Sequence, residues 1–198
     1  VATNVPVAIV LGLVPIAIVG PVLVWLDRVE PEPWSARIHA LLWGAFVATA
    51  VSGIVNEVVG VRFGFGASLV ISAPVIEETT KAMGIVYAVR RKELDGVMDG
   101  VVYAGWTALG FAIVENFLFF GLAEQEGQLL FVFVVRALLT PFAHPLFTAW
   151  TGIAIGRAVA RGAPLFPTAL GGLVLAILCH AAWNGAVSYG AEISGLVV

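Results

Sequence analysis

The segment SAPVIEETTKAMGIVYAV, residues 72–89, carries three ionisable side chains within an otherwise largely apolar stretch. Glu77 and Glu78 are adjacent, and Lys81 follows at helical spacing from both. Each charge at the centre of a membrane helix costs about 2.5 to 3.5 kcal/mol on insertion scales, so a segment that only crossed a bilayer would avoid them. Because paired carboxylates suit general acid–base chemistry or metal binding, these residues are candidates for a functional site.

Three later apolar segments also carry ionisable or amide side chains. These are Glu115 and Asn116, Arg136 and His144, and His180 and Asn184. Carboxylates and imidazoles together form zinc sites, and a possible shell here is Glu78, Glu115, His144 and His180. The chain has no H-E-x-x-H motif that would supply such ligands at a known spacing.

Each of these residues also has a simpler structural interpretation. Lys81 could merely neutralise the two glutamates on its own helix. A single histidine such as His144 is more often a hydrogen-bonded core residue than a ligand, and His180 with Asn184 could join two helices by hydrogen bonds. These interpretations do not explain why two adjacent acids occur in the middle of an apolar segment.

The composition indicates an integral membrane protein. The 198 residues are 60% hydrophobic and 12% charged, whereas an average soluble domain is about 25% charged. The net charge of -3 leaves no basic surface for nucleic acid. Membrane lipid is therefore the expected surrounding, and nucleic acid is not an expected partner.

Six apolar runs are long enough to cross a bilayer, which takes about 20 residues. They lie near 5–26, 37–59, 67–89, 97–121, 129–155 and 164–190, and short links join them. We therefore predict an all-α integral membrane protein, a bundle of about six transmembrane helices that forms a single polytopic domain over residues 1–198.

The basic residues predict how this bundle is oriented. Arg62 falls alone on one side of the membrane, and Lys81 and Arg136 lie within spans. The other side holds Arg28, Arg37, Arg90, Arg91, Lys92, Arg157 and Arg161. Because loops rich in lysine and arginine stay in the cytoplasm, both termini are predicted to be non-cytoplasmic in a prokaryotic cell membrane.

The alternating directions of the spans bring the polar residues to one depth. Glu77 lies ten residues into its span, about 15 Å at 1.5 Å per residue, near the middle of the bilayer. His144 and His180 fall at a similar depth. Glu115, Asn116, Arg136 and Asn184 fall further out. Four helices are thus expected to form one polar site that extends from the midplane outward.

The charges expected at this depth do not balance. Glu77, Glu78 and Glu115 face only Lys81 and Arg136, so one negative charge is in surplus when the histidines are neutral. A proton or a cation must compensate it.

Prolines next to the polar residues indicate that the site borders water. Pro74 lies one turn before the glutamate pair, and Pro141 and Pro145 lie on either side of His144. Each proline removes a backbone donor and loosens its helix. The freed carbonyls are tolerated at membrane depth where they line a cavity. Each proline taken singly is equally compatible with an ordinary helix kink.

Four sequence blocks resemble the motifs of the PrsW family of intramembrane proteases. They are E-E-T-T-K at 77–81, F-A-I-V-E-N at 111–116, His144 followed by Thr148 and Gly152 at four-residue steps, and H-A-A-W-N at 180–184. More distantly, they resemble the CAAX prenyl protease and bacteriocin-processing superfamily. A lysine in place of that superfamily's arginine, and Glu115-Asn116 in place of a histidine, favour the PrsW branch.

The resemblance implies a glutamate-dependent intramembrane endopeptidase that cleaves a membrane-anchored protein, with an anti-sigma factor as the best-known type of substrate. Glu77 and Glu78 would match an essential glutamate pair, one of which deprotonates the attacking water. His180 and Asn184, or a bound metal such as zinc, would hold the oxyanion. His144 would complete the catalytic set, supported by Lys81, Glu115, Asn116 and Arg136. The sequence leaves metal-dependent and metal-free mechanisms open.

Two other functions are compatible with acids at the midplane. A proton- or cation-coupled transporter or channel also places acids beside broken helices, but such proteins often have related halves. Residues 1–66 offer only Glu57 as a partner for the later cluster, so the halves do not match. A non-catalytic binder of single-pass helices would have the same fold. For such a protein, loss of Glu78 would cost no activity.

Overall fold

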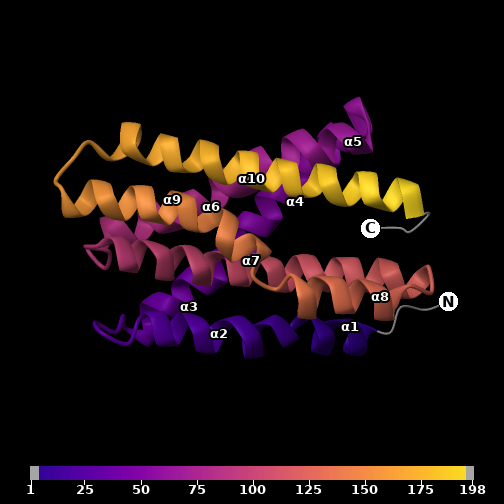
Figure 1. The fold of residues 1–198 in the computed structure, drawn as a ribbon, viewed down its shortest axis with the longest axis horizontal. Coiled ribbons are helices and arrows are strands. Elements are labelled where there is room, and N and C mark those ends of the chain that lie inside the picture. The colour runs from indigo at the N-terminus through magenta and orange to yellow at the C-terminus, as the bar shows by residue number, and fades with distance from the viewer. Residues whose placement is uncertain (1–4, 195–198) are drawn as a thin grey trace.

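The apolar runs fold into long helices because a helix satisfies its own backbone hydrogen bonds in a membrane. The computed structural model describes residues 5–194, with side chains from residue 6 to residue 190, and those residues form helices without a β-strand (Figure 1). The prediction of an all-α membrane protein is thereby confirmed.

The helices follow one another along the chain with short links. Their bounds are α1 Val5–Gly12, α2 Val14–Leu26, α3 Trp34–Leu42, α4 Thr49–Phe63, α5 Phe65–Ala67, α6 Ala73–Arg90, α7 Val97–Gln125, α8 Leu129–Phe133, α9 Ala143–Ala160 and α10 Leu165–Ser194. Three π-helical segments continue neighbouring helices without a break, namely η1 Trp43–Ala48, η2 Ser68–Ser72 and η3 Val134–Leu139.

These helices match the predicted spans to within a few residues. Within the described residues, five stretches are long and apolar enough to cross a membrane, namely Pro6–Leu26, Trp34–Phe63, Val97–Gln125, Leu129–Ala160 and Leu165–Gly190. The remaining predicted span is the continuous stretch from α5 to α6, which carries the glutamate pair and Lys81. The protein is therefore a multi-pass membrane protein with one unusually polar helix.

The fifth span differs from the prediction because it is interrupted. Helical structure stops at η3 and resumes at α9, with residues 140–142 between them. Pro141 explains the break, since proline has no N–H to donate and disfavours a helical conformation at the preceding residue, Thr140. His144 therefore lies in the first turn of α9 rather than in the middle of a continuous helix.

Helix α7 is the central helix of the bundle. Its apolar window is 72% buried, compared with 17 to 33% for the windows of the other four apolar stretches. It packs against α9, where a Cβ atom at Gly100 would overlap the carbonyl oxygen of Gly152. Glycine at both positions thus permits the close approach of these two helices.

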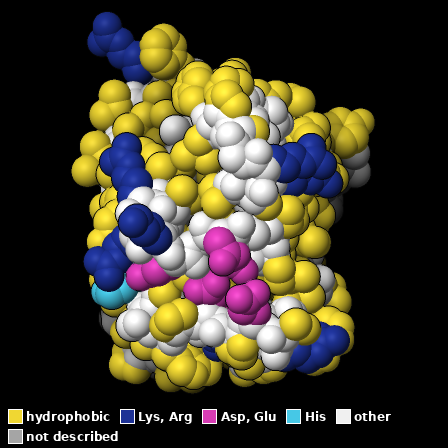
Figure 2. Space-filling model, turned by 90° about the vertical axis from the view of Figure 1, so that its left-hand side faces the viewer, with side chains coloured by type: hydrophobic (Ala, Val, Ile, Leu, Met, Phe, Trp, Pro, Cys, Tyr) yellow, Lys and Arg dark blue, Asp and Glu magenta, His cyan; other side chains and the backbone are white. Residues whose placement is uncertain are grey.

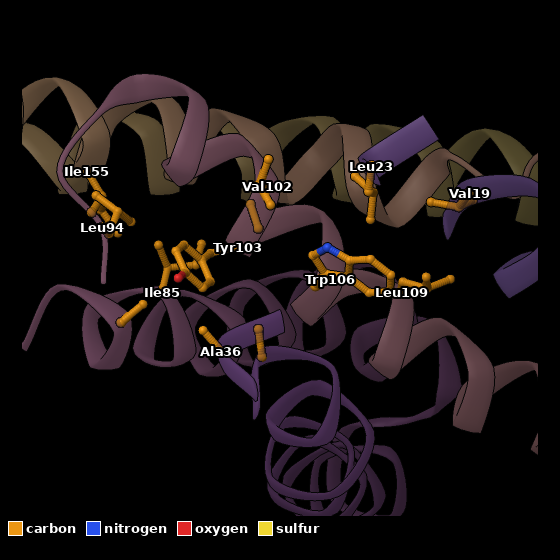
Figure 3. Packing of buried hydrophobic residues seen from close by; sticks show 13 residues of the cluster. Val19, Leu23, Ala36, Ile85, Leu94, Val102, Tyr103, Trp106, Leu109 and Ile155 are labelled. Carbon is orange, nitrogen blue, oxygen red and sulfur yellow. The ribbon is translucent and has the colours of Figure 1, made fainter. Parts of the chain in front are cut away.

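The main hydrophobic core surrounds α7, and Figure 3 shows its side chains from close by. Leu23 of α2, Ile85 of α6 and Ile155 of α9 pack around Tyr103 and Trp106 of α7. Many large apolar side chains on the outer surface are exposed instead, among them Phe46, Ile54 and Leu178. Such an exterior is expected for helices that face lipid.

The links at residues 27–33, 91–96 and 161–164 lie at one end of the bundle, on the left of Figure 1. Figure 2 shows that lysine and arginine side chains surround a central group of acidic side chains on this end. Residues 1–4 and 195–198, where the termini predicted to be non-cytoplasmic lie, are outside the described residues, but α1 begins and α10 ends at the opposite end of the bundle (Figure 1).

Candidate active site

Glu78 lies where three helices meet. Its side chain is fully buried on α6. The Oε1 atom accepts hydrogen bonds from Lys81 Nζ and from Nδ1 of His180 on α10, both at 3.0 Å. The Oε2 atom accepts a third, at 2.8 Å, from the hydroxyl of Thr148 on α9. Both oxygens of Glu78 are therefore occupied, and this carboxylate orients the groups around it.

Lys81 connects the glutamate pair to His144. Its ammonium group is fully buried and lies 3.2 Å from Nδ1 of His144, at 3.7 Å from Glu77 Oε2, and over the ring of Phe111. Lys81 lies closer to Glu78 than to Glu77. The lysine thus pairs chiefly with Glu78, while it also contacts the histidine of α9.

A second charged group, on α7 and η3, lies beside the group formed by Glu78 and Lys81. Arg136 donates hydrogen bonds to Glu115 and, at 2.8 Å, to Oδ1 of Asn116. Nε2 of His144 donates to the same oxygen of Glu115, also at 2.8 Å. His144 therefore joins the two groups, and the four helices predicted to share a polar site do meet there.

Glu77 is the carboxylate of the cluster that has a buried oxygen without a hydrogen-bond donor among the described residues. It is 5% exposed, and its Oε2 atom is buried without a hydrogen bond in the described structure. Because Glu78 pairs with Lys81 and Glu115 pairs with Arg136, the surplus negative charge falls on Glu77. A proton or a cation at this residue would complete the site.

Glu77 and the two histidines could hold a metal ion together. One ligand atom from each of Glu77, His144 and His180 lies within 4.8 Å of the others. Two imidazoles and one carboxylate are a donor set that suits zinc, and the unpaired oxygen of Glu77 fits this interpretation. Nδ1 of His144 would exchange its contact with Lys81 for the ion. The carboxylate of Glu78 on Nδ1 of His180 resembles the outer hydrogen bond that commonly orients a metal-binding histidine.

This group differs from the shell named as possible from the sequence. That shell used Glu78 and Glu115 together with the histidines, but each of these two carboxylates accepts hydrogen bonds from a basic side chain and from a histidine. In the described geometry they hold the histidines in place. Glu77 takes the position facing both rings.

Asn184 contacts the backbone of a neighbouring helix. Its amide nitrogen donates a hydrogen bond of 3.0 Å to the carbonyl oxygen of Leu69 in η2. This carbonyl lies in the π-helical segment that precedes Pro74, where the helical hydrogen-bond pattern is altered. Asn184 thus ties α10 to the start of α6, one turn from His180.

A cavity of about 210 Å³ borders Glu77 and Glu115 between α4, η2 and α7. It shares Phe65, Leu69 and Phe119 with a second cavity of about 280 Å³, which continues to Glu126 and Gln128 at the far end of α7. A third space, of about 30 Å³, lies on another side of His144 and is large enough for one water. The polar cluster therefore borders cavities.

The sequence alone did not identify Asn56 and Ser72 as neighbours of the site. Asn56 lies on α4, where its amide nitrogen is 3.4 Å from Oε1 of Glu77, and Ser72 donates a hydrogen bond to its amide oxygen. The only available signal was an amide side chain within an apolar span. Such a residue alone does not indicate which neighbour it contacts.

This chain is similar to known proteins. The model of a family described as PrsW family intramembrane metalloprotease matches residues 32–198. Protease PrsW of Clostridioides difficile (strain 630) is 29% identical over 156 residues, which cover 74% of this chain and 64% of that protein. Protease PrsW of Geobacillus kaustophilus (strain HTA426) is 30% identical over 135 residues, covering 67% of this chain and 58% of that protein. The chain thus spans less than two thirds of the length of these relatives, and no solved structure matches it.

Proposed function

This chain belongs to the PrsW family of intramembrane metalloproteases, and on that basis we propose that it hydrolyses a peptide bond of a membrane-anchored protein, of the anti-sigma-factor type. The observation that carries the proposal is the carboxylate of Glu77. One of its oxygens has no hydrogen-bond partner among the described residues, faces two histidines, and belongs to a residue that borders a cavity.

In the proposed reaction, one oxygen of Glu77 removes a proton from a water molecule in the cavity, and the other oxygen is the one that would bind a metal. The water oxygen then forms a bond to the carbonyl carbon of the substrate peptide, and the carbonyl oxygen becomes an oxyanion. Glu77 returns the proton to the peptide nitrogen as the C–N bond breaks. Lys81 and Glu78 take no proton in this scheme, because their buried ion pair fixes the position of His180.

Glu77, His144 and His180 would hold the metal that the family description implies, and zinc fits this donor set. When bound, the ion supplies a Lewis acid that polarises the substrate carbonyl. The other residues orient the ligands: Glu78 accepts from His180, and Glu115 accepts from His144.

The two neighbouring cavities, which share three lining residues, support a route for the substrate. They run from Glu77 along α7 towards residues 126–128, at the end of the bundle opposite the basic links. A substrate segment that enters between α5 and α7 would reach the glutamate from that end. We propose that this end faces outward, with both termini non-cytoplasmic in a prokaryotic membrane, because the basic links mark the cytoplasmic side and the named relatives are bacterial.

A cation-coupled transporter or channel is the second candidate, because the unpaired Glu77 and the break before α9 also suit an ion site. The deciding experiment places the purified protein in vesicles with a single-pass reporter. The wild-type protein should cut the reporter, and Glu77→Gln and Glu78→Gln should not. Glu57→Gln is the matched control, since Glu57 is exposed on α4 away from the cluster. Ion flux without cutting would favour the transporter, and cutting that survives both glutamate changes would overturn the proposal.

A further inference from the structure

Asn56 lies on the wall of the cavity beside Glu77. It comes from α4, a helix on which the sequence motifs place no site residue. Its amide nitrogen donates a hydrogen bond of 3.4 Å to Oε1 of Glu77, and both residues border the cavity of about 210 Å³. A substrate carbonyl that comes within reach of Glu77 would therefore also come close to this amide.

Ser72 of η2 holds the side-chain amide of Asn56 in this orientation, whereas Ser68 contacts only the backbone of Asn56. Ser72 donates a hydrogen bond of 2.7 Å to the amide oxygen of Asn56, so the amide nitrogen is the group left to face Glu77. Ser68 donates a second bond of 2.7 Å to the backbone oxygen of Asn56. The side-chain amide is thus positioned before any substrate is bound, as effective stabilisation of an oxyanion requires.

The other strong donors of the described site are engaged elsewhere. Asn184 donates to Leu69, Arg136 donates to Glu115 and Asn116, and Lys81 is fully buried against Glu78. By contrast, the amide nitrogen of Asn56 carries two hydrogens and makes one long hydrogen bond. It retains donor capacity next to the unpaired carboxylate.

We infer that Asn56 is a further residue of the active site, whose amide donates a hydrogen bond to the carbonyl oxygen of the substrate peptide and to the oxyanion formed from it. This inference rests on the proposed function. It adds a donor on α4 that lies beside Glu77 on the cavity wall, and it gives Ser72 the role of a positioning residue. Removal of one such donor typically lowers kcat about 10²- to 10³-fold.

The competing interpretation is that Asn56 only ties α4 to η2. Ser68→Ala is the matched control for it, because this change removes a bond between the same two segments without touching the amide. If the role were only structural, Asn56→Leu and Ser68→Ala would have similar effects on both Tm and turnover. If Asn56 stabilises the oxyanion, only Asn56→Leu lowers turnover strongly.

The experiment measures kcat and KM for a single-pass reporter, with Tm for each variant. For Asn56→Leu we expect kcat to fall about 10²- to 10³-fold with KM changed less than about threefold. Asn56→Gln should recover part of this loss of kcat. The kcat of Ser72→Ala should lie between those of Asn56→Leu and the wild type. Ser68→Ala should keep kcat within about threefold of the wild type.

Two outcomes overturn the inference: a kcat for Asn56→Leu within about threefold of the wild type, or an equal loss in Ser68→Ala. If Asn56→Leu does not fold, Ser72→Ala decides the question, because an unchanged kcat there means that the amide orientation does not matter. Failure of the proposed function is a different result, since the wild-type protein would then not cut the reporter at all.

Discussion

The Nε2 atom of His180 lies 3.9 Å from Oε2 of Glu77, and both side chains are almost fully buried. This separation is too long for a hydrogen bond, although the imidazole and the carboxylate face each other. His180 donates its ring N–H, at Nδ1, to Glu78, so Nε2, the nitrogen that faces Glu77, carries a lone pair. Two electron-rich atoms in this arrangement require a proton or a cation between them.

We expect the cation to be a zinc ion. The purified wild-type protein should contain about one zinc per chain by elemental analysis, because two histidines and one carboxylate supply three ligands. His180→Ala should lose most of this metal. His39→Ala is the matched control, since His39 is exposed on α3 away from the cluster, and it should retain the metal. Full cleavage by wild-type protein that contains no metal would contradict this expectation.

The two glutamates should differ in their effect on stability. Both Glu77→Gln and Glu78→Gln should lower cleavage at least 100-fold, roughly the contribution of a general base. Only Glu78→Gln leaves buried Lys81 without its nearest carboxylate, which should lower the free energy of unfolding by about 3 kcal/mol. Thermal unfolding in detergent measures the difference. An equal loss of Tm in both variants would mean that the lysine is shared evenly between the two carboxylates.

Cysteine labelling tests the orientation of the bundle. The background is Cys179→Ala, because the native cysteine is exposed. A cysteine at Gln125 should react with an impermeant thiol reagent from outside the cell, and one at Arg91 should react only after the membrane is opened. These positions lie in exposed segments at opposite ends of the bundle. Labelling of position 91 from outside would invert the orientation and place the cavities on the cytoplasmic side.

The span boundaries and the depth of the polar residues could be predicted because both depend only on residue counts along a helix. Counting at 1.5 Å per residue brought Glu77, His144 and His180 to one level, and the structure brings them together. The surplus negative charge was also visible in the composition of the spans. Its assignment to Glu77 was not, because the sequence does not show which carboxylate Lys81 prefers.

The direction in which each side chain points could not be predicted. A π-helical turn holds one extra residue, so side chains beyond it are rotated by about 100° from their place in a regular helix. The segments η1 and η2 lie just before the residues of α4 and α6 that border the cavity, and η3 contains Arg136. A regular helical wheel therefore misplaces Asn56 relative to Glu77. Likewise, the contact of Asn184 with Leu69 depends on the π-helical turn and not on a sequence motif.

The last prediction concerns where the substrate is cut. A second cavity neighbours the one beside Glu77 and extends along α7 to residues 126–128, so we expect the substrate to approach the glutamate from the end proposed to face outward. A helical substrate must unwind locally before its carbonyl can be attacked, because that oxygen is engaged in the helix. Unwinding costs least near the membrane boundary, where water can bond the freed backbone groups.

We therefore expect the scissile bond in the outer part of the substrate's span, or in the outer segment next to it, so that cleavage releases an external domain. Mass spectrometry of the new terminus of a single-pass reporter measures the position. Moving the reporter's apolar segment inward by four residues should move the cut by about one helical turn along its sequence, since the site is at a fixed depth. A cut in the inner half of the span would show that the substrate reaches Glu77 from the cytoplasmic side, even if Glu77 and Glu78 proved essential.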